Sequence, residues 1–104
     1  MYEYSAKCTD VINIDAIDLL LENNITVKAT LRGIAQSDDS LTVTNAKEFI
    51  KKMILKQEVI VKCKLPIDIK SGKWEVDIYF NDLKNKKTFL NEELIKKGYA
   101  KPKS

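Results

Sequence analysis

Apolar residues recur at two different spacings along this chain, and the spacing predicts where strands and helices lie. Alternate residues are apolar, with the period of two that is typical of β-strands, in three segments: 2–11, 58–65 and 74–81. A denser apolar run covers residues 11–21, and residues 25–34 continue it after Asn23-Asn24, which tolerate turn geometry. We therefore predict five strands, with the second and third joined as a hairpin.

A helical period appears after the third predicted strand. Thr44 is the predicted N-cap of a helix. One face of this helix carries the apolar residues Ala46, Phe49, Ile50, Met53 and Ile54. Its other face carries lysines, as far as Lys56. The polar segment 35–43 is predicted to be a loop, and within it the pair Asp38-Asp39 fits a solvated loop better than a metal site.

The C-terminal part predicts a second helix. Asn91 is its predicted N-cap, Leu94 and Ile95 are its buried residues, and Gly98 ends it, as glycine often does. The last four residues, 101–104, are predicted to be a frayed tail.

Composition narrows the class of protein. The chain has 104 residues, of which 44% are hydrophobic and 32% charged, which predicts one globular domain over residues 1–104. No apolar segment approaches the ~20 residues that span a bilayer, and the N-terminus lacks a secretion signal, so we expect an intracellular protein without a membrane partner. The chain has no histidine, and Cys8 and Cys63 lack metal-type spacing, which argues against zinc and against catalysis by histidine. Two reduced core thiols are the favoured interpretation.

Charge is distributed unevenly. The formal net charge is +3, but residues 1–52 carry a net charge of −2 and residues 53–104 a net charge of +5. Such a bias permits contact with nucleic acid or another polyanion. Arg32 is the sole arginine, so bidentate binding of phosphate is scarce.

Four segments in order resemble the staphylococcal nuclease family. The family patterns V-I-D-G-D-T-I and V-R-L-x-G-I-D-A-P-E correspond to V-I-N-I-D-A-I at residues 11–17 and to A-T-L-R-G-I-A-Q-S-D at residues 29–38. The segments NAKEFIKKM (45–53) and LNEELIKKGYAK (90–101) resemble the family's helices. The resemblance implies an α+β fold, the OB-fold, which is a five-stranded Greek-key β-barrel with one helix after the third strand and one at the end. It also makes the first and fourth strands neighbours, so a Cys8–Cys63 disulfide is the alternative to two free thiols.

The resemblance also implies which residues would carry calcium-assisted phosphodiester cleavage. That reaction needs oxygen ligands for the metal, a carboxylate that handles water, and cations on the phosphate. Asp15 keeps one metal carboxylate, and the water-handling glutamate becomes Asp38. The phosphate-binding arginines and a second metal carboxylate of the family are absent here. The six positions of this chain that correspond to the family's catalytic residues are Asn13, Asp15, Thr30, Ala35, Asp38 and Lys73, and as a set they are degenerate.

From this pattern we predict an inactive nuclease homologue that needs no cofactor. Asp15 and Asp38 would hold calcium weakly, and only if the chain is a weak calcium-dependent phosphodiesterase. The favoured hypothesis is binding of RNA or single-stranded DNA without cleavage, through a lysine set of Lys73, Lys84, Lys86 and Lys87. The alternative is a protein-interaction or architectural domain. In this the chain resembles the degenerate nuclease repeats of Tudor-nuclease proteins, which also bind RNA.

Overall fold

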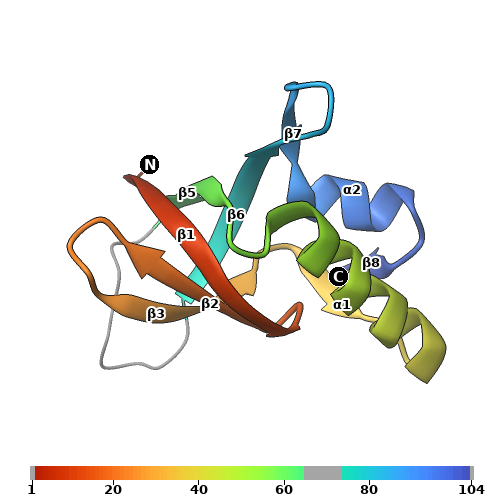
Figure 1. Ribbon diagram of the computed structural model, residues 1–104. Helices are drawn as coiled ribbons and strands as arrows, with labels where there is room; N and C mark the ends of the chain where they lie inside the picture. The colour runs from red at the N-terminus through yellow and green to blue at the C-terminus, as the bar shows by residue number, and fades with distance from the viewer. Residues whose placement is uncertain (1, 65–73, 104) are drawn as a thin grey trace.

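Figure 1 shows a β-barrel with two helices beside it, in a computed structural model that describes residues 2–64 and 74–103. The strands of the barrel are β1 (Tyr2–Asn13), β2 (Ala16–Leu21), β3 (Thr26–Leu31), β5 (Glu58–Cys63) and β6 (Trp74–Asn81). Antiparallel pairs join β3 to β2, β2 to β1, β1 to β5 and β5 to β6. A parallel pairing of β3 with β6 closes the barrel. The predicted OB-type barrel with two helices is confirmed.

Three short strands lie outside the barrel. β7 (Lys87–Phe89) extends β6 as a hairpin, while β4 (Ile34–Gln36) pairs with β8 (Ala100–Pro102) in a separate two-stranded sheet. The predictions of a loop that begins at residue 35 and of a frayed tail from residue 101 were therefore wrong. Neither β4 nor β8 shows a period of its own, and each is stabilised by a partner that is distant in the sequence.

The barrel interior follows the alternation of the sequence. Side chains from every barrel strand are buried there, among them Val11, Ile17, Leu19, Leu31, Val61, Val76 and Ile78. Trp74, at the start of β6, meets Tyr4 edge to face, with 5.5 Å between the ring centroids. Trp74 therefore packs in the core and does not offer an exposed ring for stacking.

Cys8 and Cys63 are both buried and free. The register between β1 and β5 places Cys63 opposite Tyr2, well along the strand from Cys8. The disulfide alternative is therefore wrong, because bridged cysteines need closely spaced Cα atoms. Burial raises the pKa of the Cys8 thiol to about 11 and also raises the pKa of the Cys63 thiol.

Helix α1 (Ser40–Ile54) begins four residues before the predicted cap at Thr44. Its N-cap is Asp39, whose carboxylate accepts hydrogen bonds from Thr42 N at 3.0 Å and from Thr42 Oγ1 at 2.6 Å. A serine, threonine or aspartate can serve as a cap, and several stand in a row here, so pattern alone chose the wrong one. The predicted apolar face is fully buried only at Ala46, Ile50 and Ile54.

Helix α2 (Leu90–Lys96) is followed by the C-cap Lys97 and then by Gly98, which has φ 75° and terminates the helix, as predicted. The N-cap is Phe89, and Asn91 lies inside the helix, where it is buried. The prediction of Asn91 as the cap was therefore wrong. Neither helix of the described chain is long and apolar enough to cross a membrane.

Candidate functional site

The tight turn between β1 and β2 brings together three of the residues that the resemblance singled out. Asn13 Oδ1 accepts a hydrogen bond from Asp15 N at 2.7 Å, and Thr30 Oγ1 donates to Asp15 O at 2.9 Å. Ile14 between them is buried and keeps a negative φ, so the backbone avoids the left-handed conformation that glycine would allow. The side chains of Asn13 and Thr30 thus fix the turn, while Asp15 is exposed to solvent.

Ala35 and Asp38, the other two corresponding residues in the N-terminal half, lie outside this turn. Ala35 lies in β4 opposite Lys101 and has only a methyl group to offer. The side chain of Asp38 is 98% exposed, and its Oδ2 lies 3.3 Å from Lys101 Nζ. Across residues 2–64 and 74–103, no three histidine, cysteine or acidic side chains come together as metal ligands.

The neighbouring Asp39 is bound to α1 as its cap. Hydrogen bonds from the Thr42 side chain and then from the Thr42 backbone lower the pKa of this carboxyl below its ordinary value. Asp38 and Asp39 are both exposed in the segment before α1, as the preference for a solvated loop at this pair predicted. Asp39 has a structural role that the acidic pair did not reveal.

The structure describes three of the four lysines predicted to bind nucleic acid. Lys73 lies outside the described residues. Lys84, Lys86 and Lys87 belong to the turn between β6 and β7, which we call the lysine hairpin (residues 82–87), and all three side chains are exposed. Among the ion pairs that the described residues form, none includes these three ammonium groups.

Asp82 gives the lysine hairpin a fixed backbone. Its Oδ1 accepts hydrogen bonds from Lys84 N and Lys86 N, each at 2.9 Å, and its own N–H donates to Lys86 O at 2.9 Å. Asn85 adopts the left-handed conformation, with φ 61°, which asparagine tolerates. The hydrogen bond from Lys86 N, followed by that from Lys84 N, lowers the pKa of Asp82. The three lysines therefore project from an ordered turn.

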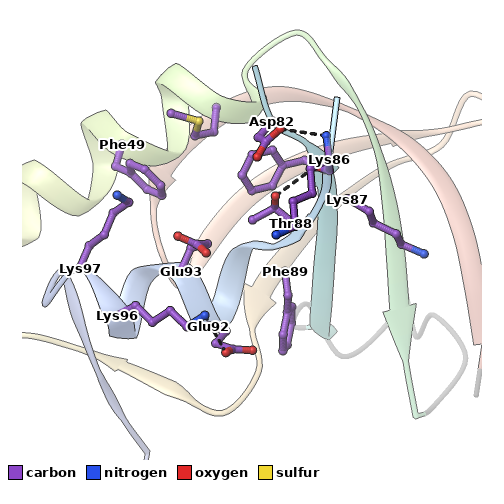
Figure 2. A pocket seen from close by; sticks show the side chains of 12 residues that line it. Phe49, Asp82, Lys86, Lys87, Thr88, Phe89, Glu92, Glu93, Lys96 and Lys97 are labelled. Atoms are coloured by element: carbon purple, nitrogen blue, oxygen red, sulfur yellow. Dashed lines mark hydrogen bonds and ion pairs between the residues drawn. The ribbon is translucent and has the colours of Figure 1, made fainter. Parts of the chain in front are cut away.

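A groove of about 470 Å³ lies between α1, α2 and the lysine hairpin (Figure 2). Four side chains supply its apolar lining: Phe49, Met53, Phe80 and Phe89. Charges of both signs surround it, including Glu92 and Lys96, which form an ion pair at 3.1 Å. Its mixed charge favours no particular ligand.

Sequence reasoning missed a buried polar network that joins β6 to α2 and to the β3–β4 turn. Arg32, from the β3–β4 turn, donates two hydrogen bonds to the Asp77 carboxylate, and Asp77 and Asn91 are both buried. Asn91 Nδ2 donates to Arg32 O at 2.9 Å and to Val76 O at 3.1 Å, and Asn91 Oδ1 accepts from Ile78 N at 3.3 Å. These bonds hold the start of α2 against β6. Because α2 directly follows β7, they fix the C-terminal end of the β6–β7 hairpin to its first strand. A lone arginine and an acid amid an apolar strand were the only signals in the sequence.

Comparison with known proteins gives one match. A family model described as "Staphylococcal nuclease homologue" matches residues 42–103, more than half of the chain. A search of curated proteins found no match. The matched range contains most of α1, all of α2 and the lysine hairpin, but it leaves out residues 1–41, which include Asp15 and Thr30.

Proposed function

Since this chain belongs to the family of staphylococcal nuclease homologues, we propose that its barrel binds RNA or single-stranded DNA without cleaving the phosphodiester backbone. The lysine hairpin carries the proposal. Its three exposed ammonium groups have no carboxylate partner in the described part of the chain, and Asp82 fixes the backbone from which they project. Free cations of this kind neutralise phosphates and release counterions, which supplies sequence-independent affinity.

The arrangement of the expected catalytic residues supports binding without cleavage. Calcium takes six to eight oxygen ligands. Asp15 and Asp38 would supply two carboxylates, and Asp38 already lies against Lys101. The Thr30 hydroxyl is bound to the Asp15 backbone and carries no positive charge for a phosphate. Loss of one preorganised hydrogen-bond donor typically raises the barrier of such a reaction by about 2.7–4 kcal/mol.

A salt-dependent titration tests the binding. Labelled single-stranded RNA and DNA are titrated with the protein, and fluorescence anisotropy is followed between about 50 and 200 mM salt. We expect affinity to fall steeply as the salt concentration rises. The double variant Lys84→Ala with Lys86→Ala should flatten the slope of log affinity against log salt concentration by about 0.7 for each phosphate that is no longer neutralised. The control variant, Lys47→Ala with Lys52→Ala, removes the same charge from α1 and should keep the slope. Equal flattening by both variants would contradict a role for the lysine hairpin.

A cleavage assay tests the other half of the proposal. The wild type and Asp15→Ala are incubated with RNA and DNA, with calcium and with a chelator. We expect no metal-dependent product from either protein. Turnover that requires calcium and disappears in Asp15→Ala would identify a working nuclease, whereas absence of binding even at low salt would favour the protein-interaction alternative.

A further inference from the structure

The outer face of the barrel carries a row of partly exposed apolar side chains next to the lysine hairpin. Ile60 in β5 lies opposite Tyr79 in β6, which lies opposite Phe89 in β7. We call these three residues the aromatic row, and each is half-buried. The residues on either side of Ile60 and of Tyr79 are buried in the barrel core, so these two side chains lie on the outside of the sheet, and Phe89 lies beside Tyr79 in the adjoining strand β7.

The two rings of the aromatic row are stacked. The Tyr79 and Phe89 centroids are 4.8 Å apart, and the ring planes differ by 14°. A shallow groove of about 280 Å³ lies beside Ile60 and Tyr79, and Glu58 and Lys87 give it one charge of each sign. Phe89 covers one face of Tyr79, so a flat aromatic ligand would stack on a remaining face of this ring pair, with the groove beside it.

Two lysines approach the same ring. Lys62 Nζ lies 4.9 Å and Lys87 Nζ lies 5.2 Å from the Tyr79 centroid. Lys62 also forms an ion pair with Glu3 at 3.6 Å, in which both side chains are partly exposed, so this pair binds the lysine weakly. Lys87 forms no ion pair within the described residues, and Figure 2 shows its side chain pointing away from the groove between the helices. The two like charges repel each other, and an anion between them would relieve this repulsion.

The aromatic row and the lysine hairpin are continuous, because Lys87 is the last residue of the hairpin and the first of β7. Sites for single-stranded nucleic acid combine these two elements, rings on which bases stack and flexible lysines along the backbone. We propose that Tyr79 and Phe89 form a stacking site for the bases of single-stranded nucleic acid and that Lys62 and Lys87 hold the adjacent phosphates. This inference rests on the proposed function, and it specifies single strands with exposed bases.

An abasic oligonucleotide provides the sharpest test on the wild-type protein. An oligonucleotide of the same length and charge, but without bases, retains every phosphate and cannot stack. We expect it to bind roughly 5- to 160-fold more weakly than the base-containing strand for each stacked base, with the same dependence on salt. Equal affinity for the two strands would overturn the stacking site while leaving the proposed function intact. No binding of either strand at low salt would overturn the proposed function itself.

Variants locate the stacking site on the protein. Tyr79→Leu with Phe89→Leu keeps apolar cover on the sheet but removes the rings, so affinity should fall by a similar factor with an unchanged salt slope. Tyr79→Phe should retain wild-type affinity, and Lys62→Ala with Lys87→Ala should flatten the salt slope. A 2-aminopurine base in the oligonucleotide should change its fluorescence on binding to the wild type and not to the leucine variant. Wild-type affinity and an unaltered 2-aminopurine response in a folded leucine variant would contradict the proposal.

Discussion

Arg32 and Asp77 form a two-point ion pair at the seam where the barrel closes. Arg32 Nε and Nη2 donate to the two Asp77 carboxylate oxygens at 3.1 and 2.5 Å. The backbone N–H of Arg32 also donates to Val76 O at 2.8 Å, so the pair continues the parallel contact between β3 and β6. The Asp77 side chain is 7% exposed and that of Arg32 is 27% exposed. The hydrogen bond to Asp77 raises the pKa of Arg32, which stays charged at any physiological pH.

The first prediction is that Arg32→Met destabilises the fold. The variant leaves the Asp77 carboxylate buried without its cation, which should lower the free energy of unfolding by about 2–4 kcal/mol, since Arg32 is partly exposed and the pair is not fully buried. Urea denaturation measures the loss. Arg32→Met combined with Asp77→Leu should recover part of it, because no buried charge remains. An unchanged midpoint in Arg32→Met would show that the pair contributes nothing to the seam.

The second prediction concerns Asn91. Asn91→Ala leaves the carbonyls of Arg32 and Val76 and the N–H of Ile78 without their side-chain partner. A buried unsatisfied group costs about 1–3 kcal/mol, so we expect a loss of at least ~2 kcal/mol in urea denaturation. Hydrogen exchange in the β6–β7 hairpin should also accelerate, because α2 would be less firmly tied to β6.

Asn91→Asp is the matched comparison. Aspartate keeps the acceptor for Ile78 N but loses both donors and places a second carboxylate beside Asp77. It should therefore be less stable than Asn91→Ala at neutral pH. Wild-type stability in both variants would show that the side chain of Asn91 is dispensable.

The third prediction separates two positions of α1 that the sequence pattern treats alike. Ile50 is 0% exposed, whereas Phe49 is only partly buried at the edge of the groove, where its ring lies 5.6 Å from the Tyr99 ring. Ile50→Ala should cost about 2–5 kcal/mol through reduced burial and a cavity, and Phe49→Ala should cost less. Urea denaturation of both variants gives the order, and a larger loss for Phe49→Ala would reverse the assignment.

The barrel was predictable because its signal is local. Alternation within β1, β5 and β6 requires no knowledge of a partner strand. Burial of Asp77 was not predictable, since it depends on Arg32 and Asn91, which lie far away in the sequence. The pairing of β4 with β8 was missed for the same reason.

The candidate site shows the same limit. The family pattern showed that Thr30 and Asp38 stand at positions that are catalytic in the family, but it could not show which groups their side chains contact. Thr30 binds the Asp15 backbone and Asp38 meets Lys101, and both interactions arise from how strands and turns approach one another. The aromatic row was missed because Tyr79 and Phe89 become neighbours only through the β6–β7 register.

The fourth prediction concerns the two thiols. Burial raises the pKa of Cys8 to about 11 and raises that of Cys63, so both thiols are protonated at pH 8 and shielded from reagents. A colorimetric disulfide reagent should find no fast-reacting thiol in the native protein and two after unfolding in urea. Because the native state favours the neutral thiol, its stability should fall as pH rises above ~8.5, the pKa of an unfolded cysteine. Rapid native labelling would contradict the burial of the labelled cysteine.

The fifth prediction is that the N-cap of α1 depends on pH through Asp39. Hydrogen bonds from Thr42 lower the pKa of Asp39 in the folded state, whereas an unfolded aspartate titrates near pH ~3.9. The carboxylate's contribution to stability is therefore complete above that pH and is lost as pH falls through the lower, folded pKa. Asp39→Asn keeps an oxygen that accepts from Thr42 N at every pH but lacks the negative charge that favours a helix N-terminus. Asp39→Ala lacks the cap at every pH.

Urea denaturation at neutral pH and in steps down to about pH 3 distinguishes these cases. At neutral pH the wild type should be the most stable, followed by Asp39→Asn and then by Asp39→Ala. As pH falls, the advantage of the wild type over Asp39→Asn should shrink, because protonation removes the charge that the amide never had. Other carboxylates titrate equally in the two proteins, so the difference between them isolates Asp39. A difference that stays constant from neutral to acidic pH would show that the ionised Asp39 carboxylate does not stabilise the start of α1.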